Sequence, residues 1–365
     1  MSLNAAVVAL LGRPVSALED VGREPLAYDP FLPGRSVARV TGIATTDPDR
    51  LSWRLIEKVT EGPAGASSYL FENGMREARA YTSGLLDDLA PRVTAPRCFA
   101  VEKRRDGGIV LWLEDLGATA ARVGPPDLVE IAADLGRFSA RWLGRVPADD
   151  WLFRGWRDRH SQPEAVAPAL ARFGSLRSAS EIERAVGWPI ADAVELIERQ
   201  PRIQTILGEL PQTLCHHDAV ASNVFRRRER DGVATVLIDW ESVGPGPVGA
   251  DLASLLFSSP RRGDVASAAV AEVIDAAVAA YAAAGREIGA PIDDGTVRLG
   301  LDAAIALRWT LARDIVVAIE DGGPIARGTA PAESRADALQ ELIALSEVLF
   351  ASGRRAAAIA GMPFR

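Results

Sequence analysis

The hydrophobic periodicity of this 365-residue chain changes near Gly117, and that change constrains the fold more than any other feature. Before it, apolar and β-branched residues alternate in short runs such as Arg35–Ala44, a pattern that predicts strands. After it, apolar residues recur at helical spacing, as in Leu128–Leu143. We therefore predict an α+β chain with a small β-rich lobe, residues 1–117, followed by a larger, mainly helical lobe, residues 118–365.

Each lobe contains several predicted elements. In the first lobe, the turn Asp47–Asp49 indicates a hairpin between Arg35–Ala44 and the next strand-like run. The other elements predicted there are the strand Leu51–Val59, a helix over Gly74–Leu89, and the strands Cys98–Glu102 and Ile109–Glu114. In the second lobe we predict two short strands within Val224–Trp240 and helices over Leu128–Leu143, Ile190–Gln200, Ala266–Ala284, Val297–Glu320 and Ala336–Ala358.

Composition excludes several classes of function. The formal net charge of -8 disfavours non-specific nucleic-acid binding, which depends on Lys and Arg contacts to phosphates. The two cysteines, Cys98 and Cys215, lie far apart and show no zinc-ligand spacing. The sequence shows no signal-peptide pattern and no apolar stretch long enough to span a bilayer. We therefore expect a cytoplasmic protein that binds neither membrane nor nucleic acid.

The loop after His216 carries a spacing that suits phosphoryl transfer. Asp218 and Asn223 have four residues between them, so their side chains can meet at a common centre. In the catalytic loop of kinases, an Asp with this spacing accepts the proton of the substrate hydroxyl and the Asn binds magnesium. Because the spacing also arises by chance, the assignment needs support from downstream residues.

Asp239 supplies that support. The apolar run Val236–Ile238 predicts a buried strand that leads directly into Asp239 and presents its carboxylate rigidly. A strand-end Asp is the second magnesium ligand of kinases. Magnesium prefers a few hard oxygen ligands together with phosphate oxygens, and Asn223 and Asp239 offer such a set. The alternative is a polar surface turn after a strand.

The segment Leu214–Leu256 resembles the aminoglycoside phosphotransferase and choline kinase superfamily. It contains His216–Asn223, which matches the H-x-D-x-x-x-x-N motif, and Ile238–Glu241, which matches the strand-end motif. Gly249–Ala253 matches a third motif in part. His217 stands where the superfamily usually has a small or apolar residue, so its role is open.

The resemblance implies a protein-kinase-like two-lobe fold and the use of ATP and Mg²⁺. It implies that Asp218 is the catalytic base and that Asn223 and Asp239 are the magnesium ligands. It also implies structural support by His216, packed or hydrogen-bonded beneath the loop, and by Asp251, which would tie the loop in place.

A kinase also needs a strand lysine for the α- and β-phosphates and a helix glutamate that orients it. Lys58 is the best candidate, because it lies in a strand-like run and the only other lysine is Lys103. A solvated edge residue is the alternative. The segment around Glu77 resembles the superfamily's R/W-x-x-E-A-x-x-Y helix, which implies Glu77 as the partner of Lys58; Glu72 is the second candidate.

Two further segments are assigned to the nucleotide. The segment that begins at Gly34 resembles the superfamily's G-x-S-x-A-x-V turn, which implies that Gly34 and Ser36 approach the phosphates. An ordinary strand-entry turn is the alternative. The apolar strand Leu111–Asp115 leaves the small lobe, and we expect the backbone of Leu113 and Glu114 to bind adenine.

Together these features predict an ATP-dependent phosphotransferase that acts on a hydroxyl of a small molecule. One alternative is another small-molecule kinase of the same superfamily, acting on choline, a sugar, homoserine or a macrolide. A second is a nucleotide-binding regulatory protein without turnover. A protein kinase is disfavoured because Trp240 and Glu241 replace the usual Phe-Gly after the metal-binding Asp.

The acceptor site is expected in the helical lobe. Acidic residues there could face a cationic acceptor, although solvated helix faces are the alternative. These residues are Asp302, Asp314, Glu320 and Asp321. The acceptor and the oligomeric state stay open, because such a pocket draws on scattered helix residues.

Overall fold

The computed structural model describes residues 3–26, 33–117, 123–158, 162–230, 232–322, 325, 327 and 334–359. The chain divides into two compact units, which are treated separately below. Unit 1 comprises Met1–Ala121 and Phe225–Val243, and unit 2 comprises Arg122–Val224 and Gly244–Arg365. The predicted α+β class is confirmed, with a β-rich N-terminal sheet and a helical C-terminal part. The boundary after residue 117 stays a prediction.

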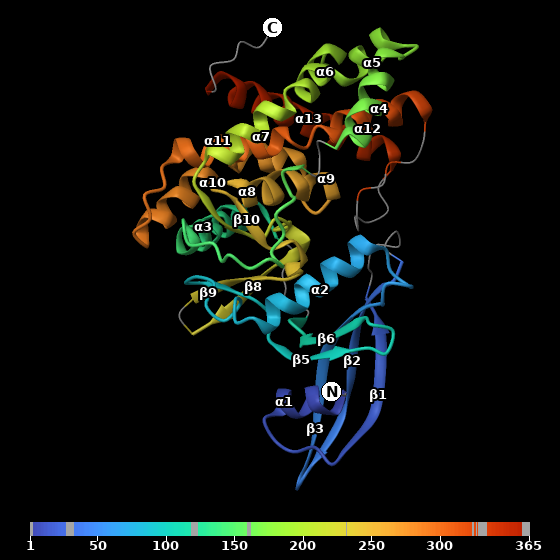
Figure 1. Cartoon of the computed structure of the whole chain (residues 1–365), viewed down its shortest axis with the longest axis vertical. Coiled ribbons are helices and arrows are strands. Elements are labelled where there is room, and N and C mark those ends of the chain that lie inside the picture. The colour runs from blue at the N-terminus through green and yellow to red at the C-terminus, as the bar shows by residue number, and fades with distance from the viewer. Residues whose placement is uncertain are drawn as a thin grey trace. The chain divides into compact units, whose positions relative to one another are not determined.

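Unit 1 is built on a five-stranded antiparallel sheet with the strand order β1-β2-β3-β6-β5 (Figure 1). The elements of this part are α1 (Leu3–Leu11), β1 (Ala17–Pro25), β2 (Arg35–Thr46), β3 (Asp49–Thr60), α2 (Ser68–Thr82), β5 (Cys98–Lys103) and β6 (Ile109–Glu114). The predicted hairpin and the two later strands are confirmed. The edge strand β1 was not predicted, because Leu18 is its only residue that is even half-buried and apolar alternation is absent.

The strand β6 is buried on both faces, which explains its unbroken apolar sequence Ile109–Leu113. Alternate side chains of a strand point to opposite faces of the sheet. The odd-numbered residues of β6 pack in one cluster with Ala78 of α2. The even-numbered residues pack in another cluster with Val7 of α1. The sheet therefore carries a helix on each face, with β3 at its centre.

The helix α2 begins and ends earlier than the predicted Gly74–Leu89. Ser67 caps its N-terminus, where the Ser67 hydroxyl accepts a hydrogen bond from the Leu70 amide at 3.3 Å. The helix ends at Thr82, and Gly84 follows in a left-handed conformation. Because apolar residues continue at helical spacing beyond Thr82, the sequence pattern predicted a helix that begins and ends several residues too late.

A second, smaller sheet belongs to unit 1 and has the order β4-β9-β8. It contains β4 (Val93–Thr94), β8 (Val224–Glu229) and β9 (Gly232–Leu237), so the two strands predicted within Val224–Trp240 are confirmed. β4 pairs with β9 in parallel, and Arg227 of β8 lies 3.3 Å from Glu114 at the end of β6. These contacts place the residues after β9 in unit 1.

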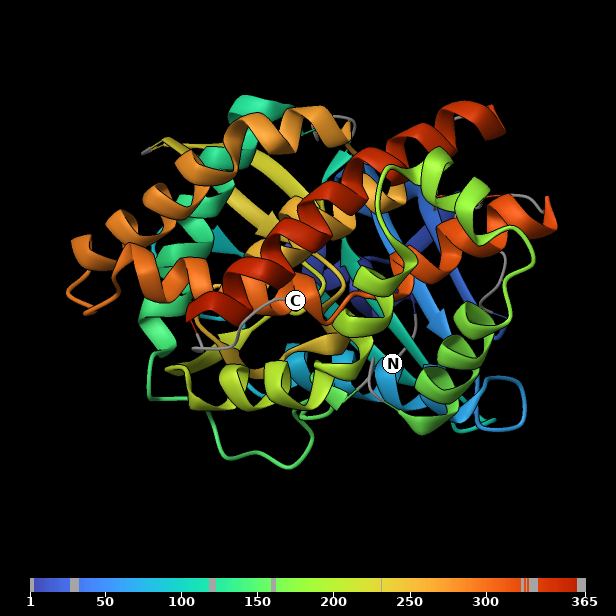
Figure 2. The ribbon, with the colours of Figure 1, turned by 90° about the horizontal axis from the view of Figure 1, so that it is seen from above.

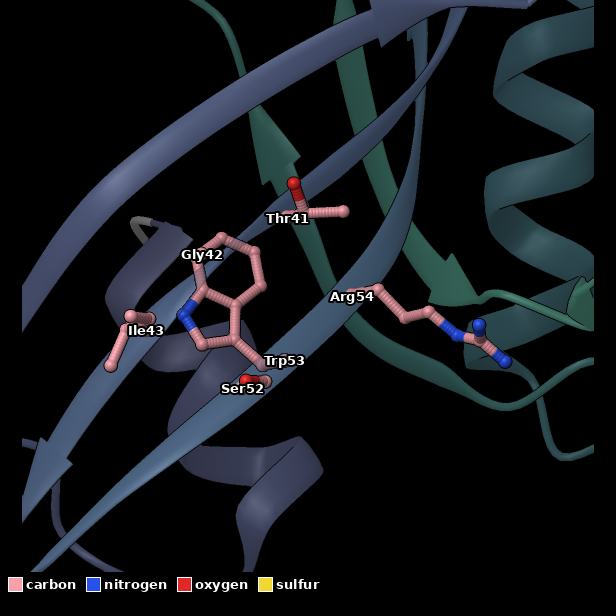
Figure 3. A pocket seen from close by; sticks show the side chains of 6 residues that line it. All are labelled: Thr41, Gly42, Ile43, Ser52, Trp53 and Arg54. Atoms are coloured by element: carbon pink, nitrogen blue, oxygen red, sulfur yellow. The ribbon is translucent and has the colours of Figure 1, made fainter.

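An open hollow lies on the outer part of the β2–β3 hairpin (Figure 3). The Trp53 indole packs over Gly42, where an added Cβ would come within 2.6 Å of the ring. The lining residues are Thr41, Gly42, Ile43, Ser52, Trp53 and Arg54. None of them is among the predicted site residues.

Unit 2 is mainly helical (Figure 2). Its longer helices are α3 (Pro125–Trp142), α4 (Pro163–Gly174), α5 (Ala179–Val186), α6 (Ile190–Glu198), α7 (Gln200–Glu209), α10 (Ser267–Glu287), α11 (Asp294–Ala306), α12 (Thr310–Asp321) and α13 (Arg335–Ile359). α13 packs against α10, α11 and α12. The single helix predicted over Val297–Glu320 is wrong, because α11 and α12 are separate. Arg308 belongs to the segment that joins them, and its side chain donates to the Ser258 hydroxyl at 3.0 Å.

Two short strands and one interrupted helix of unit 2 surround the predicted catalytic loop. β7 (Gln212–Cys215) pairs antiparallel with β10 (Gly244–Pro247). The 3₁₀ turn η3 (Ala221–Asn223) closes the loop that follows β7. After β10 come α8 (Ala250–Ala253), a π-helical turn η5 (Ser254–Ser258) and α9 (Ser259–Arg262), without a break. Single π-helical turns are frequent at functional sites.

The helix α10 is the one helix in the described part of the chain that is long and apolar enough to cross a membrane, with a mean hydropathy of 1.5. It packs directly on α3. A Cβ at Gly136 of α3 would lie 2.1 Å from the carbonyl oxygen of Tyr281, so only glycine permits this approach. The buried Tyr281 hydroxyl accepts a hydrogen bond from the Gly249 amide at 3.2 Å. These contacts pack α10 against α3 and the start of α8.

Candidate active site

Lys58 is buried at the centre of the main sheet of unit 1. Its backbone pairs with Val37 of β2 and Leu111 of β6. The Lys58 Nζ lies 2.7 Å from Glu77 Oε2 and 2.7 Å from Asp239 Oδ1. Burial by itself lowers the pKa of an ammonium, but the two carboxylates outweigh burial and raise the pKa of Lys58. The structure therefore holds Lys58 as a cation between two carboxylates.

Glu77 reaches Lys58 because α2 packs closely on β3. A Cβ at Gly74 would lie 2.4 Å from the Thr60 hydroxyl, so a glycine in mid-helix allows the approach. Glu77 is 1% exposed, and burial raises the pKa of its carboxyl although Lys58 opposes the change. The contact is an ion pair without hydrogen-bond alignment. The other candidate, Glu72, is exposed.

Asp239 follows β9 in a left-handed conformation with φ +65°, which Asp and Asn adopt more readily than other side chains. Glu241 lies in the 3₁₀ turn η4 (Trp240–Ser242) that follows, and three residues bind it. Arg35 forms an ion pair with its carboxylate, and Asn73 donates to that carboxylate at 3.2 Å. Arg76 donates to the Glu241 backbone carbonyl at 2.6 Å. None of these contacts was predicted from the sequence.

Three carboxylates of unit 1 therefore gather at one place. Ligand oxygens of Glu77, Asp239 and Glu241 lie within 4.8 Å of one another. Lys58, Arg35 and Arg76 supply three positive charges, which balance the three negative charges of the ionised cluster. Burial and then the charge of Asp239 raise the pKa of Glu241, as expected for crowded carboxylates. Magnesium prefers hard oxygen ligands, and this donor set suits such a cation.

The remaining predicted nucleotide residues flank the strand of Lys58. Gly34 precedes β2 with φ +88°, and an added Cβ there would lie 2.6 Å from the carbonyl oxygen of Gly65. Ser36 is an exposed residue of β2. Leu113, which is buried, and Glu114 end β6, on the other side of β3. The structure thus places Gly34 and Ser36 on one side of β3, and Leu113 and Glu114 on the other side.

In unit 2, Asp251 holds the start of the predicted catalytic loop. Its carboxylate accepts hydrogen bonds from the His216 amide at 2.9 Å and the His217 amide at 2.7 Å. Asp251 is 4% exposed, and burial raises its pKa although the hydrogen bonds from the His216 and His217 amides oppose the rise. His216 Nδ1 accepts a hydrogen bond from the Asp218 amide at 3.3 Å. These contacts suit the scaffold roles predicted for His216 and Asp251.

Asp218 and Asn223 meet within this loop. Asn223 Nδ2 donates to the backbone carbonyl and to the Oδ2 of Asp218, each at 3.0 Å. Because the amide nitrogen faces Asp218, the Asn223 carbonyl oxygen is the atom left to bind a cation. The Asp218 side chain is 29% exposed, and Arg262 Nη1 lies 3.5 Å from its Oδ2.

Three residues in or just beyond the following helical segment were missed by the sequence analysis. The Ser254 hydroxyl donates to the His217 carbonyl at 3.0 Å. The Ser259 hydroxyl accepts from the Ala221 amide at 2.8 Å. Asp264 accepts hydrogen bonds from the backbone amide and the hydroxyl of Ser222, at 3.2 and 2.9 Å. The helical segment α8–η5–α9 and Asp264, two residues after its end, therefore hold the loop along its length.

The role left open for His217 is structural. Its ring stacks beside the ring of Trp156, with centroids 4.8 Å apart, and Nε2 lies 3.1 Å from the Pro245 carbonyl. Burial, followed by the charge of Arg308, lowers the pKa of His217 to about 3. His217 is therefore neutral and its Nε2 donates to the carbonyl.

Cys215, His217 and Asp251 offer ligand atoms close enough together for a metal ion. Burial raises the pKa of the Cys215 thiol well above its usual range, and a metal would need the thiolate. The Asp251 oxygens already accept two amides. This group is better explained as packing beneath the loop.

Taken by itself, each unit has parts known from phosphoryl-transfer enzymes: a strand lysine ion-paired to a helix glutamate, and an Asp–Asn loop. The sequence profile of the Phosphotransferase enzyme family, APH, matches residues 63–292, more than half of the chain. The chain belongs to this family and is a small-molecule phosphotransferase. No curated protein matches the sequence.

Solved structures share the fold. An aminoglycoside phosphotransferase from Alicyclobacillus acidocaldarius superposes with a TM-score of 0.50 at 16% identity, covering 96% of this chain and 95% of that one. The microcompartment-associated aminopropanol kinase gives 0.49 at 16% identity over 99% of both chains. A choline/ethanolamine kinase family protein from Mesorhizobium loti gives 0.48 at 13% identity over 93% and 92%. The likeness to the first of these supports the fold alone.

Proposed function

We propose that this phosphotransferase moves the γ-phosphoryl group of ATP to a hydroxyl of a small molecule. The observation that carries the proposal is the buried Lys58, held as a cation at 2.7 Å from both Glu77 and Asp239. A lysine is seldom buried unless it is paired. A strand lysine that a helix glutamate orients toward the nucleotide phosphates is a working part of ATP-dependent kinases.

In this proposal the nucleotide is bound by unit 1. Lys58 donates to the α- and β-phosphates, and Glu77 keeps the ammonium in place. The backbone at Gly34 and Ser36 approaches the phosphates. The backbone of Leu113 and Glu114 binds adenine at the end of β6.

Asp239 and Asn223 would hold magnesium, and the donor chemistry of both residues fits. Asp239 belongs to a cluster of three carboxylates, and Asn223 turns its amide nitrogen toward Asp218, which leaves its oxygen for the ion. When bound, magnesium neutralises phosphate charge and aligns the triphosphate.

Asp218 would act on the acceptor. Its carboxylate orients the acceptor hydroxyl and takes the proton as the acceptor oxygen forms its bond to the γ-phosphorus. The bond between that phosphorus and the β–γ bridging oxygen breaks, and ADP leaves with the electron pair. The proton then passes from Asp218 to solvent. His216 and Asp251 keep the loop in position, so placement and charge supply most of the catalysis.

A coupled ADP-release screen over hydroxyl acceptors tests the proposal. We expect magnesium-dependent turnover with at least one acceptor, and loss of that turnover in Asp218→Asn while ATP still binds. Arg286→Ala, on the surface of α10, is the control and should behave as the wild type. Full turnover in Asp218→Asn would contradict the role of Asp218, and the absence of magnesium-dependent ATP binding would defeat the proposal as a whole.

A further inference from the structure

The acidic residues expected to face a cationic acceptor are all engaged by arginines of unit 2. Asp302, which is fully buried, pairs with Arg298 and Arg355 at 3.1 and 2.7 Å. Arg172 binds both Glu320 and Asp321, at 2.7 and 2.5 Å.

Asp314 is engaged in the same way. It lies 2.5 Å from Arg261 and 2.7 Å from Arg313, so two guanidinium groups share one carboxylate. A cationic acceptor that used one of these carboxylates would have to displace an arginine from it.

The charge beside the proposed base is positive. Arg262 Nη1 lies 3.5 Å from Asp218 Oδ2, and the Arg262 side chain is 45% exposed, so the guanidinium is paired with the base and reaches solvent. The loop from Asp218 to Asn223 contains Ala219, Val220, Ala221 and Ser222 and has no cation of its own. The guanidinium therefore comes from another element, the end of α9.

The backbone of Arg262 is held firmly to the loop it serves. Ser259, three residues before it, binds the Ala221 amide at 2.8 Å. Asp264, two residues after it, binds the Ser222 hydroxyl at 2.9 Å, and its own amide donates to the Ser259 carbonyl at 2.9 Å. Hydrogen bonds on both sides of Arg262 thus fix the start of its side chain relative to the loop.

We propose, resting on the function proposed above, that Arg262 selects the acceptor: it binds an anionic group, a carboxylate or a phosphate, of an alcohol whose hydroxyl lies at Asp218. The guanidinium leaves Asp218 for the acceptor anion as the acceptor hydroxyl takes its place at the carboxylate. Asp264 is another carboxylate bonded to the loop, but it already accepts from the amide and hydroxyl of Ser222. The substrate class is therefore a hydroxy acid or a phosphorylated alcohol, and not a polyamine-like sugar.

Acceptors matched in length and different in charge test this assignment. The assay measures ADP release above the acceptor-free rate with 3-hydroxypropanoate, propane-1,3-diol and 3-aminopropan-1-ol, and with gluconate against glucosamine. We expect the wild type to phosphorylate the acids with the highest kcat/KM. Because a hydrogen bond between charged groups is worth about 10- to 100-fold in binding, Arg262→Ala should raise KM for the acids by about that factor.

The variants separate this role from others. Arg262→Lys should recover part of the lost affinity, and Arg262→Glu should turn the preference toward the amines. The loss of kcat/KM in Arg262→Ala should be larger for the acids than for propane-1,3-diol, which has no anionic group. Arg286→Ala is a control of similar exposure, 49%, with an ion pair at 3.0 Å that involves no loop residue, and it should change nothing.

Three results would overturn the inference. One is a wild type that prefers the amines or binds magnesium-ATP yet phosphorylates none of the acids. The second is an equal loss of kcat in Arg262→Ala with every acceptor and with water, which would place the guanidinium on the transferred phosphoryl group. The third is an unchanged KM for the acids in Arg262→Ala. Failure of magnesium-ATP binding in the wild type would instead defeat the proposed function on which the inference rests.

Discussion

Removal of the Ser259 hydroxyl should disturb the catalytic loop, whereas removal of the equally buried Ser346 hydroxyl should not. Ser259 is fully buried, accepts from the Ala221 amide at 2.8 Å and donates to the Ser254 carbonyl at 3.3 Å. In Ser259→Ala the Ala221 N–H stays buried without an acceptor, which costs about 1–3 kcal/mol of unfolding free energy. Because this amide begins the 3₁₀ turn that carries Asn223, we also expect kcat to fall about tenfold through misplacement.

Ser346→Ala is the control for this variant. Ser346 is also fully buried, accepts from the Trp188 indole N–H at 3.0 Å and donates to the Ile343 carbonyl at 2.6 Å, but it contacts no loop residue among those described. Urea unfolding should show a similar loss in both variants, and ADP release should fall only in Ser259→Ala. The reasoning is refuted if Ser259→Ala loses stability but keeps the wild-type kcat.

Two further predictions concern backbone and burial. His217 is held neutral with a pKa of about 3 against an ordinary 6.5, so the folded protein loses stability as the pH falls below about 6.5. Between about pH 7 and pH 5, urea unfolding of His217→Asn should show a loss of unfolding free energy about 2 kcal/mol smaller than that of the wild type. Equal losses would contradict the burial argument. Gly34→Ala places a Cβ against backbone at φ +88°, whereas the Cβ of Gly187→Ala at φ +78° meets nothing within 4 Å. Gly187→Ala should lower the unfolding free energy by about 1 kcal/mol, and Gly34→Ala should lower it by at least about twice as much. Similar losses in the two variants would show that the loop beside Gly34 moves to accept the Cβ.

Much of the fold follows from local pattern. The β2–β3 hairpin, β5 and β6 have turn residues and alternating or unbroken apolar runs that are strong enough to read from the sequence. The edge strand β1 has almost no buried side chain, so it leaves no apolar pattern. The break between α11 and α12 at Leu307–Trp309 has neither proline nor glycine to mark it.

The contacts of the candidate site also separate into those that the sequence predicted and those that it did not. Lys58 and Glu77 were predicted as partners, and the structure brings them together; their roles toward ATP stay predictions. Asp239 also joins Lys58, a contact between distant strands that spacing does not reveal. Ser254 lies three residues after Asp251, on the same helix face, and that spacing could have indicated a shared role. Ser259 could not be found in this way, because the π-helical turn between them shifts the helical phase.

Calorimetric titration of ATP, with and without Mg²⁺, tests the central claim most directly. We predict saturable, magnesium-dependent binding to the wild type and to Asp218→Asn, and binding at least about tenfold weaker in Lys58→Met and Asp239→Asn. Glu72→Gln, which alters an exposed carboxylate of the same helix as Glu77, should bind as the wild type. A wild type that binds ATP without dependence on Mg²⁺, or a Lys58→Met variant that binds as tightly as the wild type, would contradict the account.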